Sequence, residues 1–283
     1  MKQAQDLGYK SEARRGLLFV FMAGVLWSTV GLGIRMIDEA TVWQILLYRS
    51  ISLSLFLAIV IYLRSSENLF TVVRAAGLPA CIAGLALVGA YAGGIYGIQS
   101  TSVANAMLLF ASAPFMAAIL GWIFLREKVR KATWISILFA MLGIGIMVQD
   151  KSTGSALLGN LAALGSAFGF AVFTVALRWG RSGEMLPAVF LSGIFAIFIT
   201  SSICLLSGLS FQISVNDTSI SMGMGVFQVG AGLVLYTLGS KTLPAAELTL
   251  LSLAEVLLGP LWVYLFLNEV ATFNTLFGGL VLL

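Results

Sequence analysis

One carboxylic acid stands far from both ends of a long apolar stretch. Glu255 lies in the middle of residues 245–267, and Ser252 shares its face at helical spacing. An ionisable side chain inside a membrane costs about 2.5 to 3.5 kcal/mol on insertion scales, so it is read as functional by default. Its partner would be the ammonium group of a substrate or a proton. The alternative is a protonated or hydrogen-bonded carboxyl group that holds helices together.

Arg49 is the second charge inside an apolar stretch. It lies near the start of residues 41–62, from where its long side chain would reach a nearby interface. We therefore interpret Arg49 as structural rather than as a substrate ligand. The sequence leaves open a direct ion pair between Arg49 and Glu255.

Four aromatic residues lie deep within apolar stretches, namely Trp27, Tyr91, Tyr96 and Phe170. Aromatic walls suit an apolar side chain that enters a central cavity, so we predict substrate contacts at all four. Helix packing is the alternative for each of them.

Uncharged polar residues supply a third set of candidates. Asn105 shares a helical face with Ser112, and Gln228 shares one with Gly232 and Tyr236. We predict that Asn105, Gln228 and Tyr236 hydrogen-bond a zwitterionic substrate. Such groups also bridge helices, at about 0.6 kcal/mol each.

The residues needed for most membrane-embedded enzymes are missing. The chain has no histidine, its two cysteines (Cys81 and Cys204) lie in apolar stretches, and no Walker A sequence occurs. An intramembrane enzyme would need a nucleophile with a base, an aspartate pair or a metal cluster. We therefore predict no catalytic residue, no cofactor and no metal. A scaffold or receptor without transport activity is the remaining alternative class.

The composition indicates an all-α integral membrane protein. Apolar residues make up 59% of the 283 residues and charged residues 10%, whereas soluble domains carry about 25% charged residues. Each stretch long enough to cross about 30 Å of hydrocarbon must be a helix, because its backbone has no water to bond. The last stretch is too short to cross, so we expect the sequence to stop inside its final helix. The ten predicted spans are 17–37, 41–62, 74–98, 103–125, 132–149, 156–177, 186–208, 219–240, 245–267 and 271–283.

Basic residues predict the orientation of these helices. Thirteen of the 16 Lys and Arg residues fall in the N-terminal segment and in the links after spans two, four, six and eight, against Arg35 and Lys151 on the other side. Because cytoplasmic loops are enriched in basic residues, we predict that both termini are cytoplasmic and that the chain lies in the inner (plasma) membrane. The basic residues therefore face lipid headgroups, and we predict no nucleic-acid partner.

The two halves of the chain match at an offset of 142 to 143 residues. Glu127 aligns with Glu269, Arg35 aligns with Arg178, and Trp27 falls opposite Phe170. Two repeats of five helices, at 16–149 and 156–283, would cross the membrane in opposite directions. Inverted repeats of this kind are typical of secondary transporters.

Proline interrupts the two equivalent fourth helices. We predict that Pro114 and Pro260 bend them and act in gating. Pro260 aligns with Ala118 rather than with Pro114, so the two bends would be displaced by one turn. Glycines spaced four apart predict close helix contacts, namely Gly89, Gly93, Gly97, Gly165 and Gly169.

The segment from Ala111 through Pro114 to Leu125 and Glu127, followed by an apolar helix with Gly143 and Gly145, resembles the signature of EamA domains. Such domains occur in pairs in the drug/metabolite transporter superfamily. The resemblance implies ten helices, cytoplasmic termini and secondary transport of small metabolites by alternating access. Within the superfamily the chain looks most like amino-acid exporters of the YddG type, which implies aromatic or apolar amino acids as substrates. Carriers of drugs or nucleotide-sugars are the alternatives.

Overall fold

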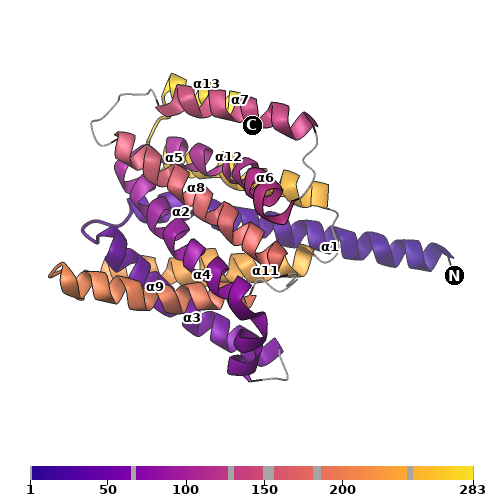
Figure 1. Ribbon diagram of the computed structural model, residues 1–283, viewed down its shortest axis with the longest axis horizontal. Coiled ribbons are helices and arrows are strands. Elements are labelled where there is room, and N and C mark those ends of the chain that lie inside the picture. The colour runs from indigo at the N-terminus through magenta and orange to yellow at the C-terminus, as the bar shows by residue number, and fades with distance from the viewer. Residues whose placement is uncertain are drawn as a thin grey trace.

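The computed structural model describes residues 2–64, 68–126, 131–148, 156–180, 186–240 and 245–282. Every regular element within those ranges is a helix, which confirms the predicted all-α class (Figure 1). In chain order the elements are α1 (Lys2–Ser28), α2 (Val30–Arg35), α3 (Val42–Arg64), α4 (Leu69–Ser100), α5 (Val103–Phe110), α6 (Ala113–Leu125), α7 (Lys131–Val148), α8 (Ala156–Trp179), α9 (Leu186–Leu206), α10 (Val215–Gly223), η1 (Met224–Ala231), α11 (Gly232–Ser240), α12 (Ala245–Leu267) and α13 (Phe273–Leu282).

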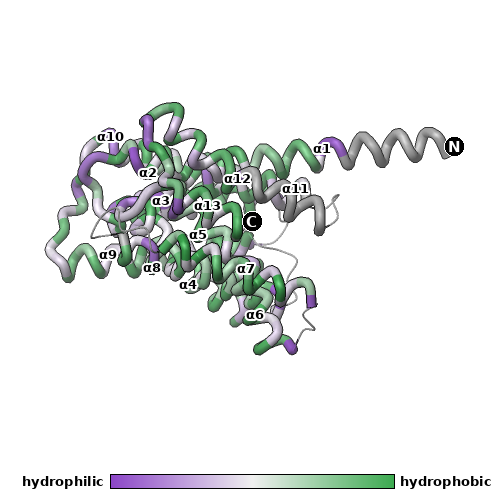
Figure 2. Tube along the Cα trace, turned by 90° about the horizontal axis from the view of Figure 1, so that it is seen from above, coloured by the Kyte–Doolittle hydropathy of each residue, from purple (hydrophilic) through white to green (hydrophobic). Residues whose placement is uncertain are grey.

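Eight helical segments of the described chain are long and apolar enough to cross a membrane. They begin with Arg14–Arg35 and end with Val215–Gly239, and they agree with the first eight predicted spans. α12 is described with side chains only from Glu255 onward, and α13 has 10 residues, so the count of ten spans stays a prediction. Large apolar side chains such as Leu63 (75% exposed) and Phe124 (71%) lie on the outside, as lipid contact requires. Hydrophobic residues cover the helices in Figure 2, while hydrophilic residues gather at helix ends such as those of α2 and α10.

The first predicted span is broken in its second half. α1 ends at Ser28 and α2 begins at Val30. The hydroxyl groups of Ser28 and Thr29 donate to the carbonyl oxygens of Val25 and Leu26, at 2.7 and 2.6 Å. Such back-bonding competes with the helix ladder and favours a bend. The break comes directly after Trp27.

The fourth predicted span is broken as well, before Pro114. α5 ends at Phe110 and α6 begins at Ala113, so Pro114 occupies the first turn of α6. That position suits proline, because the first helical N–H groups have no intrahelical partner. The predicted interruption at Pro114 is therefore present. Pro260, in contrast, lies inside α12, which runs without a break from Ala245 to Leu267.

The eighth span changes its helical pitch. Between α10 and α11 the chain forms a π-helix, η1, over Met224–Ala231. Stretches of π-helix are rare and occur often at functional sites. η1 packs against α3, and Ser52 of α3 donates a hydrogen bond of 2.9 Å to the carbonyl oxygen of Met222.

α4 lies at the centre of the bundle and packs mainly on α8 and α9. The backbones of α4 and α8 approach closely at glycines, as predicted. A Cβ atom added at Gly93 would lie 2.6 Å from the carbonyl oxygen of Ala162, and one added at Gly169 would lie 2.8 Å from that of Ala86. Real Cβ atoms do not approach so near, so only glycine fits at both positions. The prediction is wrong at Gly89 and Gly165, where such a Cβ would have no atom within 4 Å.

Gly93→Ala is expected to destabilise the protein, because its methyl group meets backbone atoms that cannot move aside. Overpacking of this kind costs about 1 to 3 kcal/mol. The measurement is the melting temperature of the purified protein in detergent. Gly89→Ala is the matched control on the same helix and should leave that temperature unchanged. Equal effects of both substitutions would show that the α4–α8 contact is not a tight one.

Candidate functional site

Three predicted site residues come together around the end of α1. The ring of Trp27 lies 5.4 Å from the ring of Tyr236 in α11, tilted by 38°. The amide group of Gln228 in η1 donates a weak hydrogen bond of 3.5 Å to the carbonyl oxygen of Trp27. Gly232 faces the Trp27 indole, where it leaves no room for a side chain. α1, η1 and α11 thus form one aromatic and polar cluster, which we call the Trp27 cluster (Trp27, Gln228 and Tyr236).

Tyr91 lies close to a charge that the sequence analysis had assigned to structure. The guanidinium carbon of Arg49 stands 4.4 Å from the centre of the Tyr91 ring. Arg49 is 4% exposed, and Tyr91 packs against both large apolar cores of the bundle. Cation–π contacts of this geometry contribute about 0.5 to 2 kcal/mol. Trp27 packs against one of the same two cores, so Trp27 and Tyr91 contact a common hydrophobic core.

Glu255 is partly buried in α12 and belongs to an inward face. Within the described residues it has no hydrogen bond or ion pair, and it does not pair with Arg49. Gly259, one turn further on, touches Met107 of α5. Trp262, two turns further on, donates a hydrogen bond of 2.8 Å to the hydroxyl group of Ser28. The face of α12 that carries Glu255 therefore turns toward the break between α1 and α2, next to Trp27.

Other predicted site residues lie elsewhere. Tyr96 is 40% exposed and Phe170 is 47% exposed, with the Phe173 ring 5.5 Å from that of Phe170. Both therefore have a large outer surface, and their predicted substrate contacts stay predictions. The side chain of Ser252 falls outside the described residues.

Asn105 is 3% exposed and fully engaged with other helices. Its amide nitrogen donates to the side chains of Thr101 and Asn160, and its oxygen accepts from the hydroxyl group of Thr275. These bonds join α5 to α8 and α13. The structure thus gives Asn105 a packing role, and its substrate contact stays a prediction.

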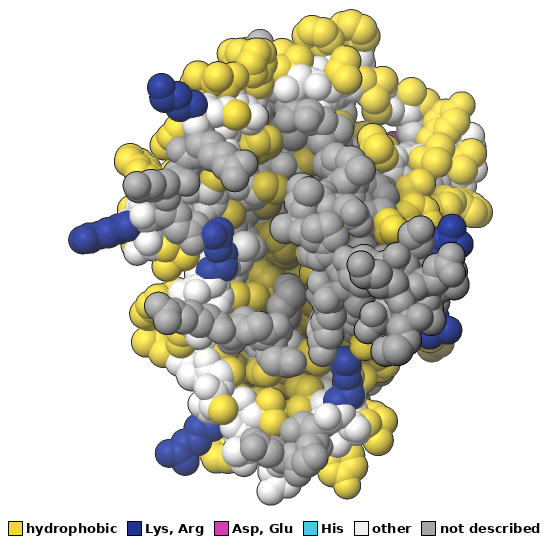
Figure 3. All heavy atoms as spheres, turned by 90° about the vertical axis from the view of Figure 1, so that its right-hand side faces the viewer, with side chains coloured by type: hydrophobic (Ala, Val, Ile, Leu, Met, Phe, Trp, Pro, Cys, Tyr) yellow, Lys and Arg dark blue, Asp and Glu magenta, His cyan; other side chains and the backbone are white. Residues whose placement is uncertain are grey.

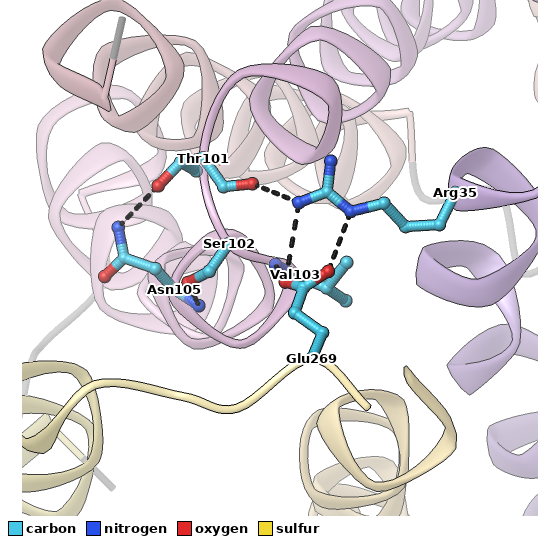
Figure 4. Close-up of polar contacts among 6 residues, drawn as sticks. All are labelled: Arg35, Thr101, Ser102, Val103, Asn105 and Glu269. Carbon is cyan, nitrogen blue, oxygen red and sulfur yellow. Dashed lines mark hydrogen bonds and ion pairs between the residues drawn. The ribbon is translucent and has the colours of Figure 1, made fainter. Parts of the chain in front are cut away.

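A polar network joins segments at one end of the bundle (Figure 4). Arg35, at the end of α2, donates from Nε to the carboxylate of Glu269 at 2.9 Å and from Nη2 to the carbonyl oxygen of Thr101 at 2.7 Å. The same carboxylate accepts from the backbone N–H of Val103 at 2.7 Å. One guanidinium group and one carboxylate thus bind together the end of α2, the start of α5 and the link between α12 and α13. We call this group the Arg35–Glu269 network (Arg35, Thr101, Val103 and Glu269).

Asp217 secures a second part of the same end. Its buried carboxylate accepts hydrogen bonds from the backbone N–H groups of Asp38, Glu39 and Ala40, at 3.0 to 3.2 Å. Three N–H donors on one carboxylate form strong charge-assisted bonds. Asp217 therefore ties the link between α2 and α3 to the first turn of α10.

Sequence reasoning did not select the Arg35–Glu269 network as a site, although it had found both residues as matched positions of the repeat. The sequence did hold a signal for this pair, because Arg35 and Glu269 each lie close to the end of a predicted span. Asp217 had no such signal, because its three partners are backbone groups.

The other end of the bundle is basic. α3 and α8 end there and α7 begins there, and the exposed basic residues surround that face (Figure 3). The residues are Arg14, Arg15, Arg64, Arg74, Arg126, Lys131 and Arg178. We call it the basic end, and the end closed by the Arg35–Glu269 network the far end. Apart from Arg35 at the far end and Arg49 within α3, the basic side chains described gather at one end as predicted, and the assignment of that end to the cytoplasm stays a prediction.

These features define a multi-pass membrane protein with broken helices, polar groups within its spans and one tightly hydrogen-bonded end. Comparison with known proteins agrees with that class. The model of the EamA-like transporter family matches residues 14–149 and again residues 157–283. The chain belongs to the EamA-like transporter family.

Individual relatives are distant. The chain is 26% identical over 189 residues to the uncharacterized transporter YwfM of Bacillus subtilis, covering 64% of this chain and 62% of YwfM. It is 27% identical over 199 residues to the protein RarD of Salmonella typhi, covering 67% of this chain and 65% of RarD. The human solute carrier family 35 member G1 is 21% identical over 288 residues, covering 94% of this chain and 76% of the carrier. A solved crystal structure matches with a TM-score of 0.66 and 17% identity over 94% of each chain, which supports the fold alone.

Glu269→Gln is expected to lower the melting temperature of the purified protein. The substitution leaves Arg35 without its carboxylate, and for a partly buried pair the loss is about 1 kcal/mol. Glu39→Gln is the matched control, because Glu39 is exposed at the same end and substitutions at such sites stay within about 0.5 kcal/mol. An unchanged melting temperature in Glu269→Gln would show that the network does not hold the far end closed.

Proposed function

We propose that this chain is a secondary transporter that moves small metabolites, namely amino acids with aromatic or apolar side chains, by alternating access. The observation that carries the proposal is the Trp27 cluster. It offers two aromatic rings and an amide group beside a break in α1, within the apolar bundle. An apolar side chain would pack on the rings, and the polar groups would orient a zwitterion.

Membership of a transporter family supports the reaction class. The names of its relatives YwfM and RarD specify no substrate, so the choice of amino acids rests on the chemistry of the cluster. The hydrogen bonds that join links at the far end support the mechanism. The Arg35–Glu269 network and Asp217 join the links of the far end, so a substrate entering the structure as it stands would approach from the basic end.

The orientation follows from the same geometry. We place the basic end at the cytoplasmic face of the inner (plasma) membrane, with both termini on that side, because basic loops stay in the cytoplasm. Net export would then begin with binding at the cytoplasmic side and end with opening of the far end. The two predicted repeats of five helices, at 16–149 and 156–283, would move against each other to open the cytoplasmic side and the far end in turn.

A transport assay tests the proposal directly. Purified protein is reconstituted into liposomes preloaded with an unlabelled amino acid, and uptake of the radiolabelled form is followed. Phenylalanine, tryptophan and leucine are expected to exchange, while glycine and lysine exchange little. Empty liposomes are the control. Failure of every amino acid to exchange would contradict the proposal and favour a scaffold or a carrier of another metabolite class.

Protons are the second proposed partner, bound at Glu255. A carboxyl group without a described ion-pair partner in a membrane span is a natural proton carrier. Glu255→Gln cannot titrate, so its rate of amino-acid exchange should no longer vary with pH between about 5 and 8. Glu39→Gln serves as the control and should keep the wild-type dependence. A Glu255→Gln protein with the full wild-type pH dependence would exclude proton coupling at this residue.

Pro114 and Pro260 are proposed as gating residues, and we expect the larger effect from Pro114. Pro114 follows a real break in its span, whereas Pro260 lies in continuous helix. Pro114→Ala should slow exchange at least severalfold, because it allows α5 and α6 to join into one straight helix. Pro260→Ala should change the rate less. Unchanged rates in both variants would remove proline bending from the mechanism.

A further inference from the structure

Two arginines lie within the described spans outside the basic end, and their surroundings differ. Arg35 has a carboxylate and a carbonyl oxygen as acceptors. Arg49 is more deeply buried, at 4% exposed, yet no carboxylate lies within 4.0 Å of it in the described part of the chain. Its Nε atom is buried without a hydrogen-bond partner there. A buried guanidinium group without an anion is costly, and such a group calls for an explanation.

Unpaired buried groups lie on α3 and on two elements packed against it, although Ser54 faces Gly193 of α9. Across the described residues, the buried side-chain atoms without a partner are Arg49 Nε and Ser54 Oγ on α3, Ser221 Oγ on α10 and Gln228 Oε1 on η1. α3 packs against both α10 and η1. Gly225 of η1 lies directly against the Arg49 carbonyl group and leaves no space for a Cβ atom. Gln228 follows Gly225 by three residues in the same π-helix.

The chemistry of these groups is complementary to an amino acid. A guanidinium group presents parallel N–H donors that match a carboxylate, and here the Nε edge is unused. Gln228 Oε1 is an acceptor that an ammonium or amide N–H would satisfy. The Gln228 amide nitrogen already touches the Trp27 carbonyl group, which connects this interface to the aromatic rings.

We infer that Arg49 binds the carboxylate of the transported substrate, and that Gln228 accepts a hydrogen bond from its amino group. The inference rests on the proposed transport of amino acids and specifies its polar half. The Tyr91 ring packs against the Arg49 guanidinium group and helps to hold it in place. The substrate class is therefore narrowed to compounds with a free carboxylate.

The test compares acids with their own amides. In the exchange assay, phenylalanine, tryptophan and leucine are each used as external competitors beside phenylalaninamide, tryptophanamide and leucinamide. The wild-type protein is expected to prefer each acid over its amide by at least about tenfold, which corresponds to about 1.4 kcal/mol. Equal competition by acid and amide in a protein that does transport amino acids overturns this inference and leaves the proposed function intact. Absence of any exchange overturns both.

Variants of Arg49 separate recognition from packing. In Arg49→Gln the acid should compete no better than its amide, while competition by the amide stays near its wild-type value. Arg49→Lys keeps the charge without the Nε donor, so its preference for the acid should lie between those of the wild type and Arg49→Gln. Arg64→Gln, at an exposed position on the same helix, is the matched control and should keep the wild-type preference. An Arg49→Gln protein that folds and retains the full preference overturns the inference, and so does an equal loss of acid and amide competition. If Arg49→Gln does not fold, the wild-type comparison of acid and amide decides.

Discussion

Hydrogen-bonding groups inside a membrane-spanning bundle have no water to bond, so each one must find a partner within the protein. That constraint explains where the polar residues of this chain lie. Asn105 joins three helices through its amide group, Asp217 takes up three backbone N–H groups, and Arg35 meets Glu269 together with a free carbonyl group. Each satisfied group ties segments that are far apart in the chain. Among the described residues, Arg49, Ser54, Ser221 and Gln228 each keep a buried atom without a partner, and Arg49 and Gln228 are the two that we propose as substrate ligands.

Broken helices are the second consequence of the same constraint. A break in a span exposes backbone groups, and it persists only where nearby groups bind them or where something else is gained. Here the break between α1 and α2 places Trp27 beside η1, and the break between α5 and α6 is stabilised by Pro114 in a first turn. The π-helix η1 packs against α3 and α1, and its Gln228 donates to the carbonyl oxygen of Trp27. Irregular backbone therefore surrounds the proposed site, while α3, α9 and the centre of α8 remain regular supports.

Sequence reasoning succeeded where a single residue type has few physical solutions. Proline at position 114 has no N–H to donate, and the helix does break before it. Glycine at positions 93 and 169 has no side chain, and helix backbones do meet there. Aromatic depth was a weaker guide, because a residue halfway along a span faces either lipid or protein. Trp27 and Tyr91 turn inward, whereas Tyr96 and Phe170 keep large exposed surfaces. Arg49 was assigned to structure because its long side chain was expected to reach a nearby interface, whereas it is 4% exposed and packs on Tyr91.

The sequence by itself determined the all-α membrane class, the positions of the first eight spans and the family, because apolar length, charge placement and the spacing around Pro114 are local properties of the chain. Only the tertiary structure decided which polar groups meet. Arg35 and Glu269 are 234 residues apart, and Gln228 and Trp27 are 201 residues apart. Contacts at such separations depend on the rotation of each helix about its axis, and that rotation is set by packing against all of its neighbours together.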